Sequence, residues 1–176
     1  VAEDAVDRDA PDRLRHLASD EWVLAHGVHL ADDSAMRGTV VHNPRSNLNN
    51  AVGYARPARF ANPVALGTDG IGADMLDEFR LAFVLDRAAD VTSAPTRAWS
   101  WLEAGRALVP DVAIDRVTWS YPDMEPWHLA YTTGVHPVEI EVDGQMVWRD
   151  GAPTRVDPAE IRAKAAEQSA RLFQRL

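Results

Sequence analysis

Three short apolar segments, each followed at once by a polar or glycine-containing loop, constrain the fold of this chain more than any other feature. They are WVLAH (residues 22–26), TVVH (39–42) and PVALGT (63–68). Apolar runs of this length are typical of buried parallel strands. Segments with helical spacing of apolar residues follow at 74–86 and 95–109. The repeated order of strand, turn and helix predicts a parallel α/β fold.

The pattern changes after Val117. In VEIEVDGQMVWRDG (138–151), apolar and polar residues alternate on both sides of Asp143-Gly144, a dipeptide that favours a tight hairpin with a type I′ turn. A last helix is expected from Asp157 onward, with proline at its first position. We therefore expect three segments: 1–116 with parallel strands, 117–156 with an antiparallel hairpin, and 157–176 as a terminal helix.

Composition narrows the class of protein. The formal net charge is -9 and no basic run offsets it, so we expect neither nucleic acid nor a membrane surface as a partner. The absence of cysteine excludes disulfides and thiolate zinc sites and favours a reducing compartment. No apolar stretch approaches the roughly 20 residues of a membrane span. We expect a cytoplasmic protein, and the first residue, Val1, suggests a processed or partial chain.

Polar side chains gather in the loops that follow the three predicted strands. Because the carboxyl ends of parallel strands meet at one edge of a sheet, these side chains are expected to form one site. Each has a simpler interpretation when taken alone, since a histidine after an apolar run is often a hydrogen-bonded core residue and GTDG is a common turn. The candidates are His26 and His29 in LAHGVHL, His42, Asn43, Ser46 and Asn47 in VVHNPRSNLNN, and Asp69 in GTDG.

Taken together and in this order, several segments resemble the second half of amidohydrolase-superfamily enzymes of the cytosine/guanine deaminase and chlorohydrolase branch. The segments are VAE, LAHGVHL, VVHNPRSNLNN, GTDGIGADMLDEFRLA and VDGQMVWRDG. The resemblance implies an α/β fold in which this chain supplies the C-terminal part of a (β/α)₈ TIM-like barrel and strands of a small β-sandwich. With 176 residues the chain is too short for a whole barrel, which needs about 250.

The resemblance also implies roles for individual residues. Asp69 corresponds to the metal-binding aspartate that takes a proton from the metal-bound water, and His26 to the histidine that orients this water or the substrate. Glu3 in Val1-Ala2-Glu3 corresponds to a proton-shuttling glutamate, although a glutamate in an acidic tail is more often simply solvated. The implied cofactor is one divalent metal, zinc first and iron second. Substrate contacts, or a structural role, are expected for His29, His42, Asn43 and Asn47.

Part of the implied metal site is missing. No His-x-His pair occurs, and the histidine expected before Val1 is absent. We therefore expect an upstream segment or a second polypeptide to complete the barrel, in a homo- or hetero-oligomer. The resulting hydrolase would act on C–N or C–Cl bonds of a small, heterocyclic substrate. One alternative is a non-catalytic subunit used for binding or assembly, and another is a free-standing small α/β binding domain.

Overall fold

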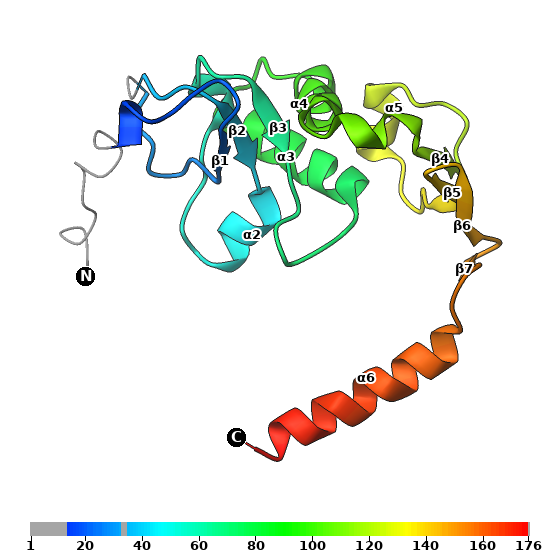
Figure 1. The fold of residues 1–176 in the computed structure, drawn as a ribbon. Helices are drawn as coiled ribbons and strands as arrows, with labels where there is room; N and C mark the ends of the chain where they lie inside the picture. Colours follow the sequence, from blue (N-terminus) through cyan, green and yellow to red (C-terminus); the bar gives the residue numbers. More distant parts are fainter. Residues whose placement is uncertain (1–13, 33–34, 176) are drawn as a thin grey trace. The chain divides into compact units, whose positions relative to one another are not determined.

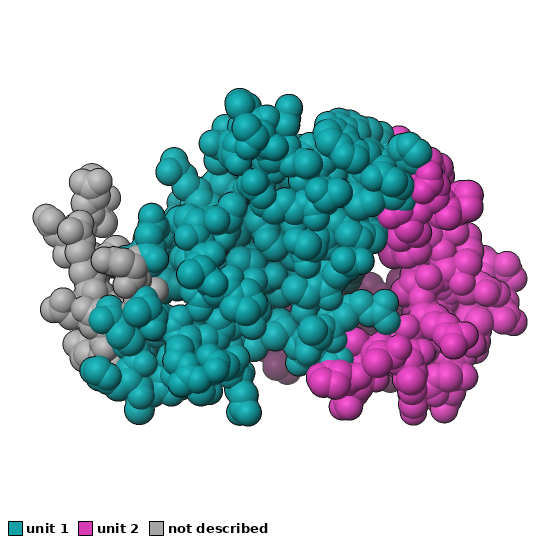
Figure 2. Space-filling model, turned by 90° about the horizontal axis from the view of Figure 1, so that it is seen from above, with its two compact units in different colours: residues 1–109, 125–132 teal, residues 110–124, 133–176 magenta. Residues whose placement is uncertain are grey.

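The computed structural model describes residues 14–32 and 35–175, which fold as a mixed α/β chain in two compact units (Figure 2). The first unit comprises the chain up to Val109 together with the separate segment Glu125–Thr132. The second unit comprises Pro110–Met124 and the chain from Thr133 onward. The segment boundaries expected from the sequence, at 116 and 156, remain a prediction of how the protein is organised.

A three-stranded parallel sheet forms the centre of the first unit. Its strands are β1 (Val23–Ala25), β2 (Thr39–His42) and β3 (Val64–Leu66), in the order β1-β2-β3 (Figure 1). The register pairs Val40 with both Leu24 and Val64. All three predicted strands are confirmed. Burial is complete for β3 and for alternate residues of β2. The predicted burial of β1 is wrong, since Val23 and Ala25 are exposed and only one neighbouring strand, β2, pairs with it in the described residues.

Two helices pack beside β3 and complete the core of this unit (Figure 1). Helix α3 (Met75–Ala89) begins where the Asp74 carboxylate accepts hydrogen bonds from the backbone of Leu76 and Asp77, as expected for an N-cap. Helix α4 (Pro95–Leu108) has proline in its first turn. Their buried side chains lie at helical spacing and include Leu76, Phe79, Phe83, Ala98 and Trp101.

The connections between the strands contain little helix. Between β2 and β3 the structure has only α2 (Pro44–Asn49) and the 3₁₀ turn η2 (Pro57–Arg59). Between β1 and β2 no helix forms in the described residues. Helix α5 (Pro126–Tyr131) also belongs to the first unit and buries Leu129.

The second unit is an antiparallel sheet with the order β4-β5-β6-β7. Strands β5 and β6 form the predicted hairpin, and Asp143 and Gly144 both have positive φ, as a type I′ turn requires. This confirms the turn inferred from the sequence. The strands are β4 (Arg116–Trp119), β5 (Pro137–Val142), β6 (Gln145–Arg149) and β7 (Ala152–Pro153), preceded by the 3₁₀ turn η3 (Pro110–Ile114).

Helix α6 (Pro158–Phe173) is the last element of the second unit (Figure 1). Asp157 caps it by accepting from the backbone of Ala159, which agrees with the predicted start. The helix has no buried residue, so its apolar residues such as Ile161 and Phe173 are exposed. None of the helices in the described part of the chain combines the length and the hydrophobicity that a bilayer crossing requires.

Candidate active site

The polar loops predicted from the sequence meet at one edge of the parallel sheet. His26 follows β1 directly, Asn43 follows β2, and Asp69 stands three residues after β3 ends. Because the three strands are parallel, their carboxyl ends share an edge. The structure joins five of the candidate side chains. Hydrogen bonds link His26 to Asn47 and Asn43, and Ser46 to Asp69, and His26 also lies opposite the Asp69 carboxylate.

Asp69 is held by two hydrogen bonds. The Ser46 hydroxyl donates to Oδ2 at 2.5 Å, and the Gly70 amide donates to Oδ1 at 2.8 Å. These two donors, the serine first, lower the pKa of Asp69 from its ordinary value, and the nearby His26 adds a smaller effect in the same direction. An ionised carboxylate offers about four acceptor positions, so Asp69 retains capacity to bind a cation or accept a proton.

His26 faces Asp69 and is oriented by an amide. Its Nε2 lies 3.7 Å from Asp69 Oδ2, and its Nδ1 lies 2.8 Å from Asn47 Oδ1. An amide oxygen only accepts, so Nδ1 carries a proton in this contact, and Nε2 is the ring nitrogen that faces Asp69. Asn43 Nδ2 approaches the same Nδ1 at 3.4 Å, and we give this longer contact less weight. About two fifths of each of the His26 and Asp69 side chains is exposed.

His42 lies at the end of β2 but has no exposed surface. Neither ring nitrogen has a hydrogen-bond partner in the described part of the structure, and the ring packs edge-on against Tyr54, with centroids 5.7 Å apart. Burial, followed by the charge of His26, lowers the pKa of His42 to about 4. His42 is therefore neutral at physiological pH and belongs to the buried core at the end of β2. The substrate contact considered for it stays a prediction.

The structure gives less information about the roles of the other candidate residues. His29 is exposed in the loop after β1, and no hydrogen bond joins it to Asp69 or His26. Asn43 and Asn47 are buried at 5% and 1% exposure, which suits residues that orient His26. Glu3 lies outside the described residues. Its predicted role as a proton shuttle, like the substrate contacts of His29, Asn43 and Asn47, stays a prediction.

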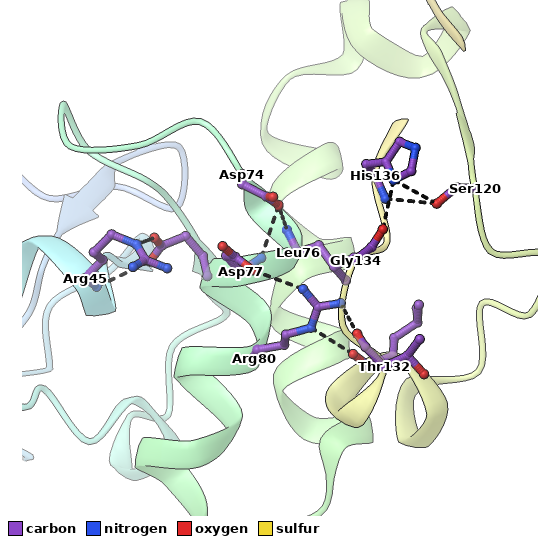
Figure 3. A network of polar contacts seen from close by, with 11 residues as sticks. Arg45, Asp74, Leu76, Asp77, Arg80, Ser120, Thr132, Gly134 and His136 are labelled. Carbon is purple, nitrogen blue, oxygen red and sulfur yellow. Dashed lines mark hydrogen bonds and ion pairs between the residues drawn. The ribbon is translucent and has the colours of Figure 1, made fainter. Parts of the chain in front are cut away.

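A half-buried ion pair anchors α2, the helix that carries Ser46 and Asn47. Arg45 Nε donates to Glu78 Oε1 at 2.6 Å, and Glu78 on α3 is 1% exposed (Figure 3). Arg80, which also lies on α3, donates to the carbonyl oxygens of Leu129 at 2.9 Å and Thr132 at 2.6 Å. The helix that follows the Asp69 loop is thus fixed on two sides. No local motif in the sequence marks these contacts, so they could not be predicted from it.

Gly67 is required by close packing beside the site. A Cβ atom at this position would lie 2.8 Å from Val41 Cγ1 and would also overlap the Asn43 side chain. Any larger residue would therefore displace Asn43 from its place next to His26. This explains in steric terms why glycine precedes Thr68 and Asp69 in the GTDG turn.

Comparisons with known proteins agree with this geometry. A 5-methylthioadenosine/S-adenosylhomocysteine deaminase from Haloarcula marismortui is 30% identical over 93% of this chain and 45% of its own length. A 5'-deoxyadenosine deaminase from Methanocaldococcus jannaschii is 27% identical over 82% of this chain and 42% of its own. In sequence, the chain is thus similar to deaminases of the amidohydrolase superfamily over most of its length. No protein-family model matches it.

The fold of this chain is also found in a solved structure. An adenosine deaminase from Xanthomonas campestris with bound zinc superposes with a TM-score of 0.66 at 20% identity, over 93% of this chain and 45% of the other. The chain thus spans less than half the length of the relatives it matches. In residues 14–32 and 35–175, no three His, Cys, Asp or Glu side chains come together in a way that could hold a metal ion.

Proposed function

We propose that this chain forms part of a metal-dependent deaminase that hydrolyses the exocyclic C–N bond of an adenine nucleoside. The main support for this proposal is the Asp69 carboxylate. It is fixed by Ser46 and Gly70 and faces His26 at the carboxyl edge of a parallel sheet. The relatives' names favour C–N over C–Cl bonds, since each is a deaminase of an adenosine-type compound. In this proposal β1–β3 belong to a (β/α)₈ barrel, and β4–β7 to a small sandwich.

The side chains of the site fit a zinc-type metal in part. Zinc accepts carboxylate oxygen and imidazole nitrogen as ligands, and Asp69 presents such an oxygen at the edge of the sheet. We assign Asp69 as the direct ligand from this chain and the remaining ligands to another segment or polypeptide. A divalent metal at such a site supplies an activated water by lowering its pKa toward neutrality.

The chain's own residues then perform three tasks. Asp69, kept ionised by its two donors, accepts the proton of the attacking water and delivers it toward the departing ammonia. His26, with its proton on Nδ1, offers Nε2 as an acceptor that orients this water. Asn47 fixes the tautomer and the direction of the ring. The products are the keto form of the base and ammonia, so atoms and charge balance.

Substitutions at Asp69 and His26 in the complete protein test this proposal. Asp69→Asn removes the charge and the proton acceptor, so ammonia release from 5'-deoxyadenosine should fall by about a hundredfold or more, with loss of metal. His26→Asn should also lower the rate but retain most of the metal. Asp143→Asn is a matched control, because Asp143 in the hairpin shares the left-handed backbone conformation of Asp69, at φ 51° against 53°.

The outcomes separate two of the three hypotheses that the sequence left open, the hydrolase and the non-catalytic subunit. Normal activity in the Asp69 variant, or metal loss confined to the His26 variant, would overturn the assigned roles. A complete protein that binds no metal and releases no ammonia would instead support a non-catalytic subunit that uses this surface for binding or assembly.

A further inference from the structure

The side chain of Arg59, the last residue of η2, is directed at the loop that follows β1. Its Nη2 donates to the carbonyl oxygens of Leu30 at 2.5 Å and Gly27 at 3.2 Å. Its Nε donates to the Ala55 carbonyl at 2.9 Å, and its Nη1 pairs with Asp32. The Arg59 side chain is only 20% exposed. All three guanidinium nitrogens are therefore engaged, and they connect two loops that are distant in sequence.

An aromatic ring reinforces this connection. The guanidinium carbon of Arg59 lies 4.3 Å from the centroid of the Phe60 ring, within the range of a cation–π contact. The same ring packs against Gly27, where an added Cβ would come within 3.2 Å of Phe60 Cζ. Arg59 and Phe60 thus contact the residue that directly follows His26.

The backbone at His26 needs such support. His26 has φ 69° and Gly27 has φ 67°, so two successive residues adopt the left-handed conformation. A non-glycine residue persists in this conformation only where its surroundings fix it. On one side, the His26 amide donates to the Val41 carbonyl at 2.8 Å. On the other side, Arg59 binds the carbonyl groups that follow.

We propose that Arg59 is a positioning residue for His26, which holds the loop after β1 so that the imidazole faces Asp69. The step from position to reaction rate rests on the proposed function. Arginine is suited to this role because its planar fork binds several acceptors at once, whereas lysine supplies only a point charge. Arg59 has no hydrogen bond to Asp69 or to the His26 ring, so its effect on rate passes through the loop.

A structural measurement tests the positioning directly. The imidazole proton signals of His26 are assigned in the complete protein by their loss in His26→Asn, and then compared in Arg59→Met and Arg59→Lys. We expect both Arg59 variants to shift or broaden these signals. Arg37→Met is the matched control, since Arg37 makes an exposed guanidinium–carboxylate pair with Asp20 in the same unit, at 2.5 and 2.9 Å. Unchanged His26 signals in folded Arg59→Lys would overturn the proposal.

A double-mutant cycle on the rate separates positioning from general stability. Arg59→Lys should lower kcat roughly tenfold with KM little changed, and should have less than about a twofold effect when His26 is already Asn. Equal losses in both backgrounds would show that Arg59 does not act through His26 and would overturn the proposal. If His26→Asn alone leaves the rate unchanged, the proposed function of His26 fails, and the proton signals still decide whether Arg59 positions the ring.

Discussion

The buried neutral His42 predicts a specific dependence of folding stability on pH. Above its ordinary pKa of 6.5, His42 is neutral in both the folded and the unfolded chain. As the pH falls below 6.5, the unfolded chain binds a proton, whereas folded His42 resists protonation until about pH 4. The free energy of unfolding must therefore decrease as the pH falls through this window.

The size of the effect follows from the two pKa values. The full difference between 6.5 and about 4 corresponds to roughly 3 kcal/mol, of which about 2 kcal/mol is already lost at pH 5. His42 is completely buried, so solvent screening does not reduce this contribution substantially. A loss of about 2 kcal/mol is large against the 5–15 kcal/mol that is typical of a folded protein.

Denaturant unfolding of the wild-type protein and of His42→Gln, each measured at pH 5 and near pH 7.5, tests the reasoning. Glutamine does not titrate in this range, so the variant should lose about 2 kcal/mol less than the wild type on acidification. Comparing the two pH dependences removes the carboxylates and the other histidines, which both proteins share. Parallel losses in the two proteins would show that His42 is not the titrating group.

Two further substitutions test the turn between β5 and β6 and the N-cap of α3. Gly144→Val places a β-branched residue at φ 70°, with no neighbouring atom to clash, so backbone strain alone should lower stability by about 1–2 kcal/mol and leave kcat unchanged. A loss of kcat at unchanged stability would contradict the separation of this hairpin from the site. Asp74→Ala removes the two hydrogen bonds that cap α3 and should lower the thermal midpoint by an amount equivalent to about 1 kcal/mol, and an unchanged midpoint would argue against the cap.

Local sequence patterns predicted the elements but not the way in which they associate. The three parallel strands and the Asp143-Gly144 turn depend on neighbouring residues, and their positions were predicted correctly. Helix α5 lies in the stretch that separates the two parts of the second unit, yet it belongs to the first. Its place depends on the burial of Leu129 and on the contacts that Arg80 makes, which no spacing along the chain reveals.

The same distinction applies to the site. The loops that follow parallel strands predicted that His26 and Asp69 would meet, because strand direction alone brings them to one edge. The sequence could not predict that His42 would be buried without a partner or that Arg59 would bind the carbonyl group of Gly27. These features depend on which polar groups remain unpaired after the loops pack, and that is a property of the folded chain.

The three parallel strands pair in the order in which they occur along the chain, and the residues from His26 to Asp69 form one uninterrupted stretch. Parallel pairings such as Leu24 with Val40 and Val40 with Val64 require a loop to close first, so they form more slowly than contacts between near neighbours in the sequence. The approach of His26 to Asp69 should thus arise only when the three strands pair. Because synthesis proceeds from the amino terminus, the chain can pair these three strands before the hairpin of the second unit has been synthesised.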